Sequence, residues 1–167
     1  MRSYLIKLLF LPLLGIMFSC TESTMKRELV LIPEPMILEE RKGVYVLDED
    51  LSIHISDDSL LHETAELFAD MLRSSTGYRV SIDNNIDERR GIVFELKETQ
   101  GSGNEGYQLE IKRKSIHISA PGPEGIFYGI QSLRQLFPPE IEVDGSKDVK
   151  WELPCVYIED YPRFHWR

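Results

Sequence analysis

The chain has 167 residues, which corresponds to one domain of ordinary size with short appendages. That length excludes a complete (β/α)8 barrel, because the barrel alone needs about 250 residues. Apolar residues make up 42% and charged residues 28% of the chain, as in soluble globular proteins. The 28 acidic side chains outnumber the 19 basic ones, and the net charge of −9 argues against nucleic acid as a partner because phosphates would be repelled.

The beginning of the chain has the organisation of an export signal. Arg2 and Lys7 form a positively charged start without a nearby acid, and the apolar run from Leu8 to Phe18 follows. This run is too short to cross a bilayer as an ordinary helix. We therefore expect residues 1–19 to be a signal peptide and the protein to be exported.

The end of this signal resembles the lipobox of bacterial lipoproteins, through Met17-Phe18-Ser19-Cys20. In that family the cysteine becomes the lipidated N-terminus, so the resemblance implies lipid attachment at Cys20 and a membrane as partner. The protein would then be anchored in a bacterial cell envelope, in the periplasm or at the cell surface. Residues 20–28 are polar and would form a flexible tether. A plain secretory signal cleaved elsewhere is the alternative.

The first folded segment is expected to be extended. Two prolines bracket one glutamate in Leu29–Pro35, which excludes a helix there. Met36–Glu39 and Val44–Leu47 flank Arg41-Lys42-Gly43, a pattern that predicts two short strands joined by a tight turn. Leu51–Ile55 alternates apolar and polar residues and predicts a third strand.

A helix is predicted over about Ser59–Ser74. Residues 56–59 supply N-cap candidates, and Gly77 is a natural C-cap because glycine tolerates the left-handed conformation. Its expected apolar stripe consists of Leu60, Leu61, Thr64, Leu67, Phe68, Met71 and Leu72. Tyr78–Ile82 predicts the strand that follows.

Ile92–Leu96 predicts the next strand, because β-branched and aromatic residues occur together in it. A glycine-rich stretch follows, and residues 101–106 match the spacing G-x-G-x-x-G of dinucleotide-binding loops. That motif functions between a strand and a helix N-terminus, whereas here it leads into the strand pattern Tyr107–Ile111. The stretch is therefore interpreted as a hairpin loop, and no cofactor is expected.

The second half of the domain repeats the order of strand and helix. Tyr107–Ile111 and Ser115–Ser119 predict a second hairpin, and Pro121–Glu124 begins a second helix. Its apolar stripe consists of Ile126, Phe127, Ile130, Leu133, Leu136 and Phe137. Pro138-Pro139 ends that helix. The last strands are predicted at Trp151–Leu153 and Val156–Ile158.

These elements predict an α+β fold: a mostly antiparallel sheet with two helices packed on one face. Ser-Ile-His-Ile-Ser occurs at 52–56 and again at 115–119, each time before a helix. The alternation within the strands predicts a second sheet face that is wet or meets a partner. His54 and His117 are therefore expected to be surface residues.

No residue pattern indicates a catalytic centre. None of the four histidines has a metal-binding spacing, and no nucleophile elbow is present. The acid pairs Glu39-Glu40, Asp57-Asp58 and Glu159-Asp160 occur in a turn, at a helix start and at a strand end, where acids have structural uses. Cys155 lies between apolar neighbours and is expected to be a buried small hydrophobe. No catalytic or metal-binding residue is therefore assigned.

Four segments together resemble the non-catalytic N-terminal domain of family 20 glycoside hydrolases, the β-N-acetylhexosaminidases. They are Leu31-Ile32-Pro33-Glu34-Pro35, Gly106-Tyr107-Gln108-Leu109, Gly125-Ile126-Phe127-Tyr128-Gly129-Ile130-Gln131-Ser132-Leu133-Arg134-Gln135-Leu136 and Ile158-Glu159-Asp160-Tyr161-Pro162-Arg163-Phe164-His165-Trp166-Arg167. The third segment is shared with lead domains of family 84 and of some α-glucuronidases. The fourth is the most specific for family 20.

The resemblance implies that this domain precedes a (β/α)8 barrel and braces it. In the intact enzyme the 2-acetamido oxygen of the substrate attacks the anomeric carbon, an Asp orients that group, and the adjacent Glu is the general acid/base. Those residues lie in the barrel, so the present chain is expected to be inactive alone. Glycan contact would occur only through the barrel.

By this resemblance, residues 29–157 form the lead domain, and 158–167 form the joint to a barrel that the chain lacks. Arg163 and Arg167 match joint arginines, so no sugar-binding role is assigned to them. We expect the chain to be a truncated product. The alternatives are a stand-alone lipid-anchored glycan-binding or interaction domain, and the lead domain of a family 84 or α-glucuronidase glycosidase.

Overall fold

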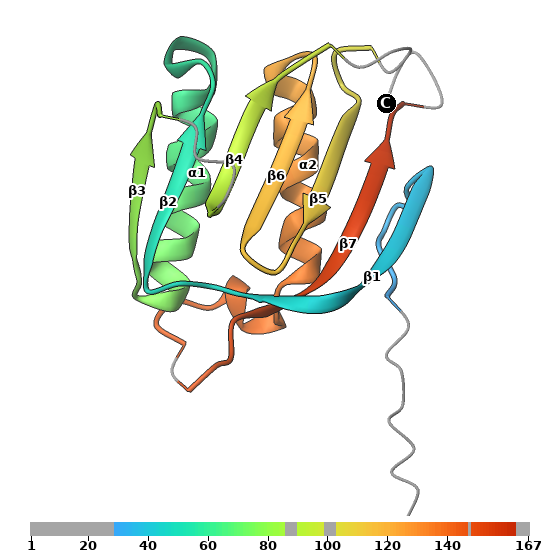
Figure 1. The fold of residues 1–167 in the computed structure, drawn as a ribbon. Coiled ribbons are helices and arrows are strands. Elements are labelled where there is room, and N and C mark those ends of the chain that lie inside the picture. Colours follow the sequence, from blue (N-terminus) through green and yellow to red (C-terminus); the bar gives the residue numbers. More distant parts are fainter. Residues whose placement is uncertain (1–28, 86–89, 99–102, 147, 163–167) are drawn as a thin grey trace, which may run out of the picture.

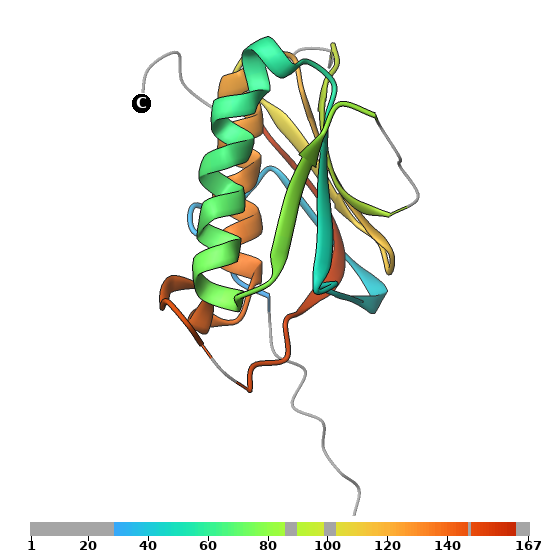
Figure 2. The same cartoon turned by 90° about the vertical axis from the view of Figure 1, so that its left-hand side faces the viewer.

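The computed structural model of the chain describes residues 29–85, 90–98, 103–146 and 148–162. Its elements are β1 (Ile37–Val46), β2 (Asp50–Ile55), α1 (Asp58–Thr76), β3 (Arg79–Asp83), β4 (Gly91–Leu96), β5 (Tyr107–Ile111), β6 (Ser115–Ala120), α2 (Pro123–Leu136), the 3-10 helix η1 (Pro139–Glu142) and β7 (Glu152–Asp160). The strands form one sheet, and both helices lie on the same face of it (Figures 1 and 2). The expected α+β class with two helices on one face is confirmed. The expected signal, the tether and Cys20 lie outside the described residues.

The sheet has the strand order β1-β7-β5-β6-β4-β2-β3 and is mixed. The half from β1 to β6 pairs antiparallel, as the expected hairpins require, and the half from β6 to β3 pairs in parallel. Parallel pairing follows from the repeated order of strand and helix, because a strand that returns through a helix runs in the same direction as the first. α1 connects β2 to β3 in this way, and α2 connects β6 to β7 across β5.

The predicted hairpin over residues 36–47 is wrong, because this segment is the single long strand β1. Both of its halves pair with β7, from Ile37 opposite Glu159 to Val46 opposite Glu152. The register shifts between Glu40 and Val44, so the residues expected to form a turn form a bulge instead. Glycine is nevertheless required at this position, since Gly43 has a φ of 123°, which other residues rarely adopt.

The first helix begins and ends where its sequence signals predict. The Asp57 side chain accepts hydrogen bonds from the Ser59 hydroxyl at 2.7 Å and from the Ser59 amide at 3.0 Å, and the hydroxyl contact is the main cause of the lowered pKa of Asp57. Gly77 ends the helix with a φ of 72°, and its amide donates to the Arg73 carbonyl. The residues of α1 buried against the sheet are Leu61, Ala65, Phe68, Ala69 and Leu72.

At two glycine positions, the second helix lies so close to the sheet that a side chain would not fit. A Cβ atom on Gly129 would lie 2.6 Å from Ile118 Cγ2 on β6. A Cβ atom on Gly125 would lie 2.3 Å from the Gly106 carbonyl oxygen. The two glycines of the Gly-Ile-Phe-Tyr-Gly segment therefore determine how α2 is seated on β5 and β6.

The sheet face without helices carries mostly polar side chains, and its burial varies along the face: His54 and Val93 are buried, whereas His117 and Glu110 are partly exposed. One row of residues crosses it from strand to strand in register: Asp83, His54, Val93, His117, Glu110 and Tyr157. His54 is only 8% exposed and is not a surface residue as expected. His117 is half-buried, and its Nε2 lies 3.3 Å from Glu95 Oε2. The alternation therefore predicted the correct face for both histidines but not the burial of His54.

Candidate functional site: an apolar groove between the helices

The acid pairs that the sequence offered occupy separate structural positions. Asp57 caps α1, while Glu159 on β7 accepts hydrogen bonds from Tyr157 Oη at 2.6 Å and from Gln108 Nε2 at 3.2 Å. Asp160 is buried, and its Oδ1 accepts from the Met36 amide at 3.3 Å. Over the described residues, no three His, Cys, Asp or Glu side chains come together as metal ligands. In the same part of the chain, no helix is long and apolar enough to span a membrane.

Cys155 lies on β7 and is buried, as its apolar neighbours predicted. Burial raises the pKa of its thiol, although the positive charges of Arg113 and Arg41 oppose this effect. A thiol held in the protonated form is a poor nucleophile. The side chain therefore serves in packing.

The site that the structure adds is a groove of about 310 Å³ between α1 and α2. Its walls are Thr64, Leu67, Phe68 and Met71 of α1 and Phe127, Ile130, Gln131 and Arg134 of α2. Leu67 is 64% exposed and Phe127 is 45% exposed, although both were expected in the core. Large apolar side chains grouped around one groove are typical of a surface that contacts a ligand or another part of a protein.

The sequence contained a signal for this groove that the single-stripe interpretation missed. In a helix, residues four and seven positions apart lie on one face. Leu60, Thr64, Leu67 and Met71 have this spacing, and they form a second stripe beside the buried stripe of Leu61, Phe68 and Leu72. The sheet buries one of these stripes, so the second apolar stripe of α1 remains exposed beside it.

One end of the groove is bordered by the guanidinium group of Arg134, which is held in place by an ion pair. Arg134 binds both carboxylate oxygens of Glu142 through one guanidinium nitrogen, at 2.9 and 2.7 Å, and donates to Gln131 at 3.1 Å. These contacts connect α2 to η1. They hold the guanidinium in one orientation at the groove, where it gives a polar border to the apolar walls.

The family-like segments converge in space although they are far apart in the chain. Gln135 on α2 exchanges two hydrogen bonds with the backbone of Ile32, at 2.9 and 3.0 Å. The Tyr107 hydroxyl on β5 lies 2.6 Å from the Ser132 hydroxyl on α2. Asp160, in the fourth segment, holds Met36 as described above. These residues have structural roles, and the expected joint residues Arg163 and Arg167 lie outside the described part of the chain.

Comparison with known proteins identifies the relatives of this domain. Residues 28–161 match the family model of Glycosyl hydrolase family 20, domain 2. The chain is 30% identical over 138 residues to a β-hexosaminidase of Porphyromonas gingivalis, covering 82% of the chain and 18% of the relative. It is 26% identical over 142 residues to a β-N-acetylhexosaminidase of Cellulomonas fimi, covering 84% of the chain and 27% of the relative.

A solved structure shows the same arrangement. The family 20 β-N-acetylhexosaminidase of Streptomyces coelicolor aligns with a TM-score of 0.74 and 33% identity, over 80% of this chain and 26% of that protein. The chain thus spans about a fifth to a quarter of the length of the relatives it matches.

Proposed function

The chain belongs to glycosyl hydrolase family 20, and on that premise we propose that it is the non-catalytic domain that braces the catalytic (β/α)8 barrel of a β-N-acetylhexosaminidase. The longer protein would remove terminal β-linked N-acetylhexosamine by substrate-assisted retaining hydrolysis. The match to family 20 favours this parent over a family 84 or α-glucuronidase enzyme. The domain itself would perform no hydrolysis.

The observation that carries this proposal is the groove between α1 and α2. Its exposed walls are mostly apolar, and the relatives are about four to six times as long as the matched region. The catalytic barrel is the part of those proteins that has the size to cover a helix layer. We therefore place the barrel contact on the helix layer, with Leu67 and Phe127 inserted into it.

The test places the domain in an intact enzyme. Residues 28–161 replace the corresponding segment of the Porphyromonas gingivalis β-hexosaminidase, and hydrolysis of an aryl N-acetyl-β-glucosaminide is measured beside thermal unfolding. We expect the chimera to be active and the 167-residue chain to show no turnover. Turnover by the chain alone would contradict a purely bracing role.

The contact surface is tested with Leu67→Asp and Phe127→Asp. Both side chains are exposed in the isolated domain, so these changes should alter its free energy of unfolding by less than about 0.5 kcal/mol. In the chimera a buried, unpaired carboxylate would lower Tm by roughly 4 °C or more. Val46→Asp is the matched control on β1, because Val46 is 58% exposed and lies outside the groove. Equal effects of all three changes in the chimera would refute this placement of the barrel.

We also propose that the protein is exported and anchored to a bacterial envelope membrane by lipid on Cys20. The support is the order of charge, apolar run and Met17-Phe18-Ser19-Cys20 in the sequence. Growth with labelled palmitate should label the wild-type chain but not Cys20→Ala, and the wild type should fractionate with membranes. Label retained by Cys20→Ala would disprove attachment at this residue.

A further inference from the structure

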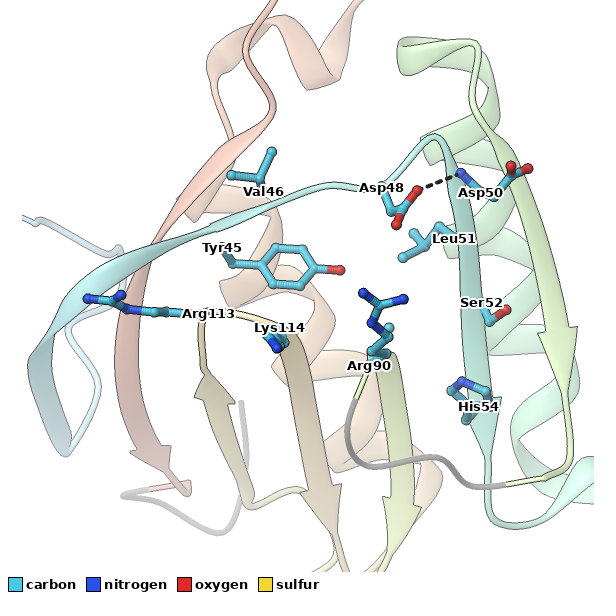
Figure 3. A pocket seen from close by; sticks show the side chains of 11 residues that line it. Tyr45, Val46, Asp48, Asp50, Leu51, Ser52, His54, Arg90, Arg113 and Lys114 are labelled. Atoms are coloured by element: carbon cyan, nitrogen blue, oxygen red, sulfur yellow. Dashed lines mark hydrogen bonds between the residues drawn. The ribbon is translucent and has the colours of Figure 1, made fainter.

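A polar cavity of about 380 Å³ lies on the sheet face that carries no helix (Figure 3). The chain between β1 and β2 crosses the ends of the central strands here, and the cavity lies under that crossing (Figures 1 and 3). Its walls come from this crossing, from β2, from the start of β4 and from the turn between β5 and β6. Ligand pockets range over about 300–1,000 Å³, so this cavity is suited to a small molecule.

Cations from two different segments line the cavity. Arg90 directly precedes β4, and Arg113 and Lys114 form the turn between β5 and β6. Within the described residues, none of the three has a carboxylate within ion-pair distance, although the chain carries a net charge of −9. The Arg113 side chain lies against Gly43 and turns away from the cavity, whereas Arg90 and Lys114 remain beside it (Figure 3).

Two buried side chains add hydrogen-bonding groups to the cavity. Tyr45 is 3% exposed, and its hydroxyl points across the cavity toward β2 (Figure 3). Burial, reinforced by the charge of Asp48, raises the pKa of Tyr45 to about 12, so the hydroxyl remains a donor at neutral pH. The imidazole of His54 also lines the cavity, and its buried Nδ1 has no hydrogen-bond partner among the described residues.

The floor beside His54 is kept open by Gly91. Its φ is 81°, and a Cβ atom there would lie 2.5 Å from the Ser52 carbonyl oxygen and 3.4 Å from His54 Nε2. A side chain at this position would therefore strain the backbone and occupy the space next to the imidazole.

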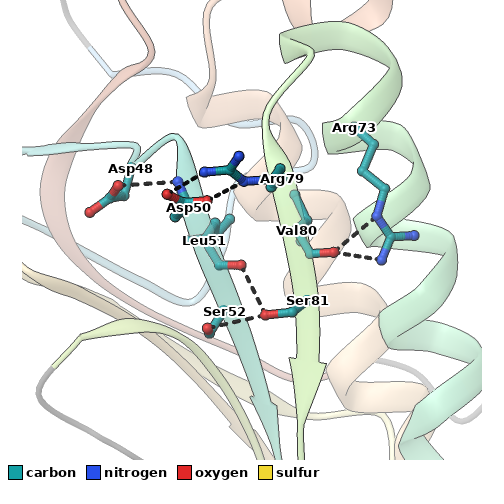
Figure 4. Close-up of polar contacts among 8 residues, drawn as sticks. All are labelled: Asp48, Asp50, Leu51, Ser52, Arg73, Arg79, Val80 and Ser81. Carbon is teal, nitrogen blue, oxygen red and sulfur yellow. Dashed lines mark hydrogen bonds and ion pairs between the residues drawn. The ribbon is translucent and has the colours of Figure 1, made fainter.

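The opposite wall of the cavity presents hydrogen-bond acceptors. Both oxygens of Asp50 accept from the Arg79 guanidinium, with 2.7 Å to Oδ2, so its charge is already balanced (Figure 4). Asp48 accepts from the Asp50 amide at 3.2 Å and faces the cavity (Figures 3 and 4). It has no cation within ion-pair distance among the described residues. A ligand here would meet cations on one side and a carboxylate on the other.

We propose that this cavity binds a small sugar that carries a sulfate or phosphate ester, with the oxyanion between Arg90 and Lys114 and sugar hydroxyls donating to Asp48. Ionic contacts to a tetrahedral oxyanion suit these two side chains. The buried Tyr45 ring offers no exposed plane for stacking a base or a neutral sugar. This inference is independent of the barrel contact, because it concerns the face of the sheet opposite the helices.

The test is a titration of the full chain followed by ¹H–¹⁵N NMR, with four probes: a glucose sulfate ester, a glucose phosphate ester, unmodified glucose and sodium sulfate. Saturable shifts are expected with at least one ester, centred on the amides of Ser52, His54, Gly91 and Lys114. Glucose should give none, and sodium sulfate should bind about tenfold more weakly than the ester because it lacks the hydroxyls. The two esters distinguish sulfate from phosphate as the oxyanion.

Arg90→Ala and Lys114→Ala should each weaken ester binding by about tenfold. Lys42→Ala and Lys97→Ala remove exposed cations outside the cavity and should change binding by less than about twofold. The proposal fails if the esters shift none of these amides, or if the control variants weaken binding as much as Arg90→Ala. Glucose that binds as well as its esters would exclude oxyanion recognition. Sodium sulfate that binds as well would exclude recognition of the sugar.

Discussion

The side-chain amide of Gln135 makes two hydrogen bonds to the backbone of Ile32, one as acceptor and one as donor. Gln135 Oε1 accepts from the Ile32 amide at 2.9 Å, and Gln135 Nε2 donates to the Ile32 carbonyl at 3.0 Å. The residues are 103 positions apart, so this pair fastens the segment that precedes β1 to the last turn of α2. A primary amide has both a donor and an acceptor, so this one side chain makes both hydrogen bonds.

Gln135→Ala should release the segment around Ile32. Loss of two solvent-exposed hydrogen bonds should lower the free energy of unfolding by about 1 kcal/mol. Hydrogen exchange at the Ile32 amide should become faster, and urea denaturation should show the stability change. Gln131→Ala on the same helix is the control, since the side chain of Gln131 accepts from Arg134 whereas Ile32 bonds Gln135. Unchanged exchange at Ile32 would rule out this role for Gln135.

Gly129→Ala should destabilise the fold, although alanine is the better helix former by about 1 kcal/mol. The new methyl group would lie 2.6 Å from Ile118 Cγ2, so α2 would have to move away from β6. We expect a net loss of about 1–3 kcal/mol in urea denaturation. In a double-mutant cycle, Ile118→Ala should reduce that loss because it removes the contacted atom. Additive effects of the two changes would show that the contact does not determine the packing.

The stability of the folded chain should decrease in acid through Glu110. Burial favours the neutral form, but hydrogen bonds from Lys112 and Arg41 outweigh it and lower the pKa of Glu110 below its usual 4.5. The folded state therefore binds this proton less readily than the unfolded state. The resulting stability is fully present above about pH 4.5 and is lost as the pH falls through the lowered pKa.

Urea denaturation at several pH values checks this prediction. Glu110→Gln should flatten the fall in stability on the acid side, and Arg41→Met should do so in part because Lys112 remains. If Glu110→Gln lost stability in acid as steeply as the wild type, the effect would come from other carboxylates.

Cys155 should react slowly with thiol reagents in the folded chain. It is 3% exposed, and burial raises the pKa of the thiol, so little thiolate is present and access is restricted. Peptide mapping after iodoacetamide treatment should show modification at Cys155 in urea but not in native buffer. Equal labelling in both conditions would contradict the burial of this side chain.

Much of the fold follows from local patterns in the sequence. Asp57 and Gly77 mark the ends of α1, and Pro123 and Pro138-Pro139 bound α2, because these residues act on the backbone within a few positions. The alternation in β2 and β6 gave both strands their correct buried faces. The groove was not predicted, because an apolar helix stripe does not reveal whether its partner is the sheet or another domain.

The sequence by itself located the extended segments, the two helices and the family of the domain, since each depends on residues close together in the chain. It divided β1 and β7 into two strands each, whereas each is one strand in the structure. Only the tertiary structure decided that Arg41-Lys42-Gly43 is a bulge, because that depends on β7 more than 100 residues later. It also decided that His54 is buried and that Leu67 and Phe127 are exposed. The periodicity of apolar residues shows which face of a helix or strand is apolar. Whether that face is buried depends on which other part of the protein packs against it.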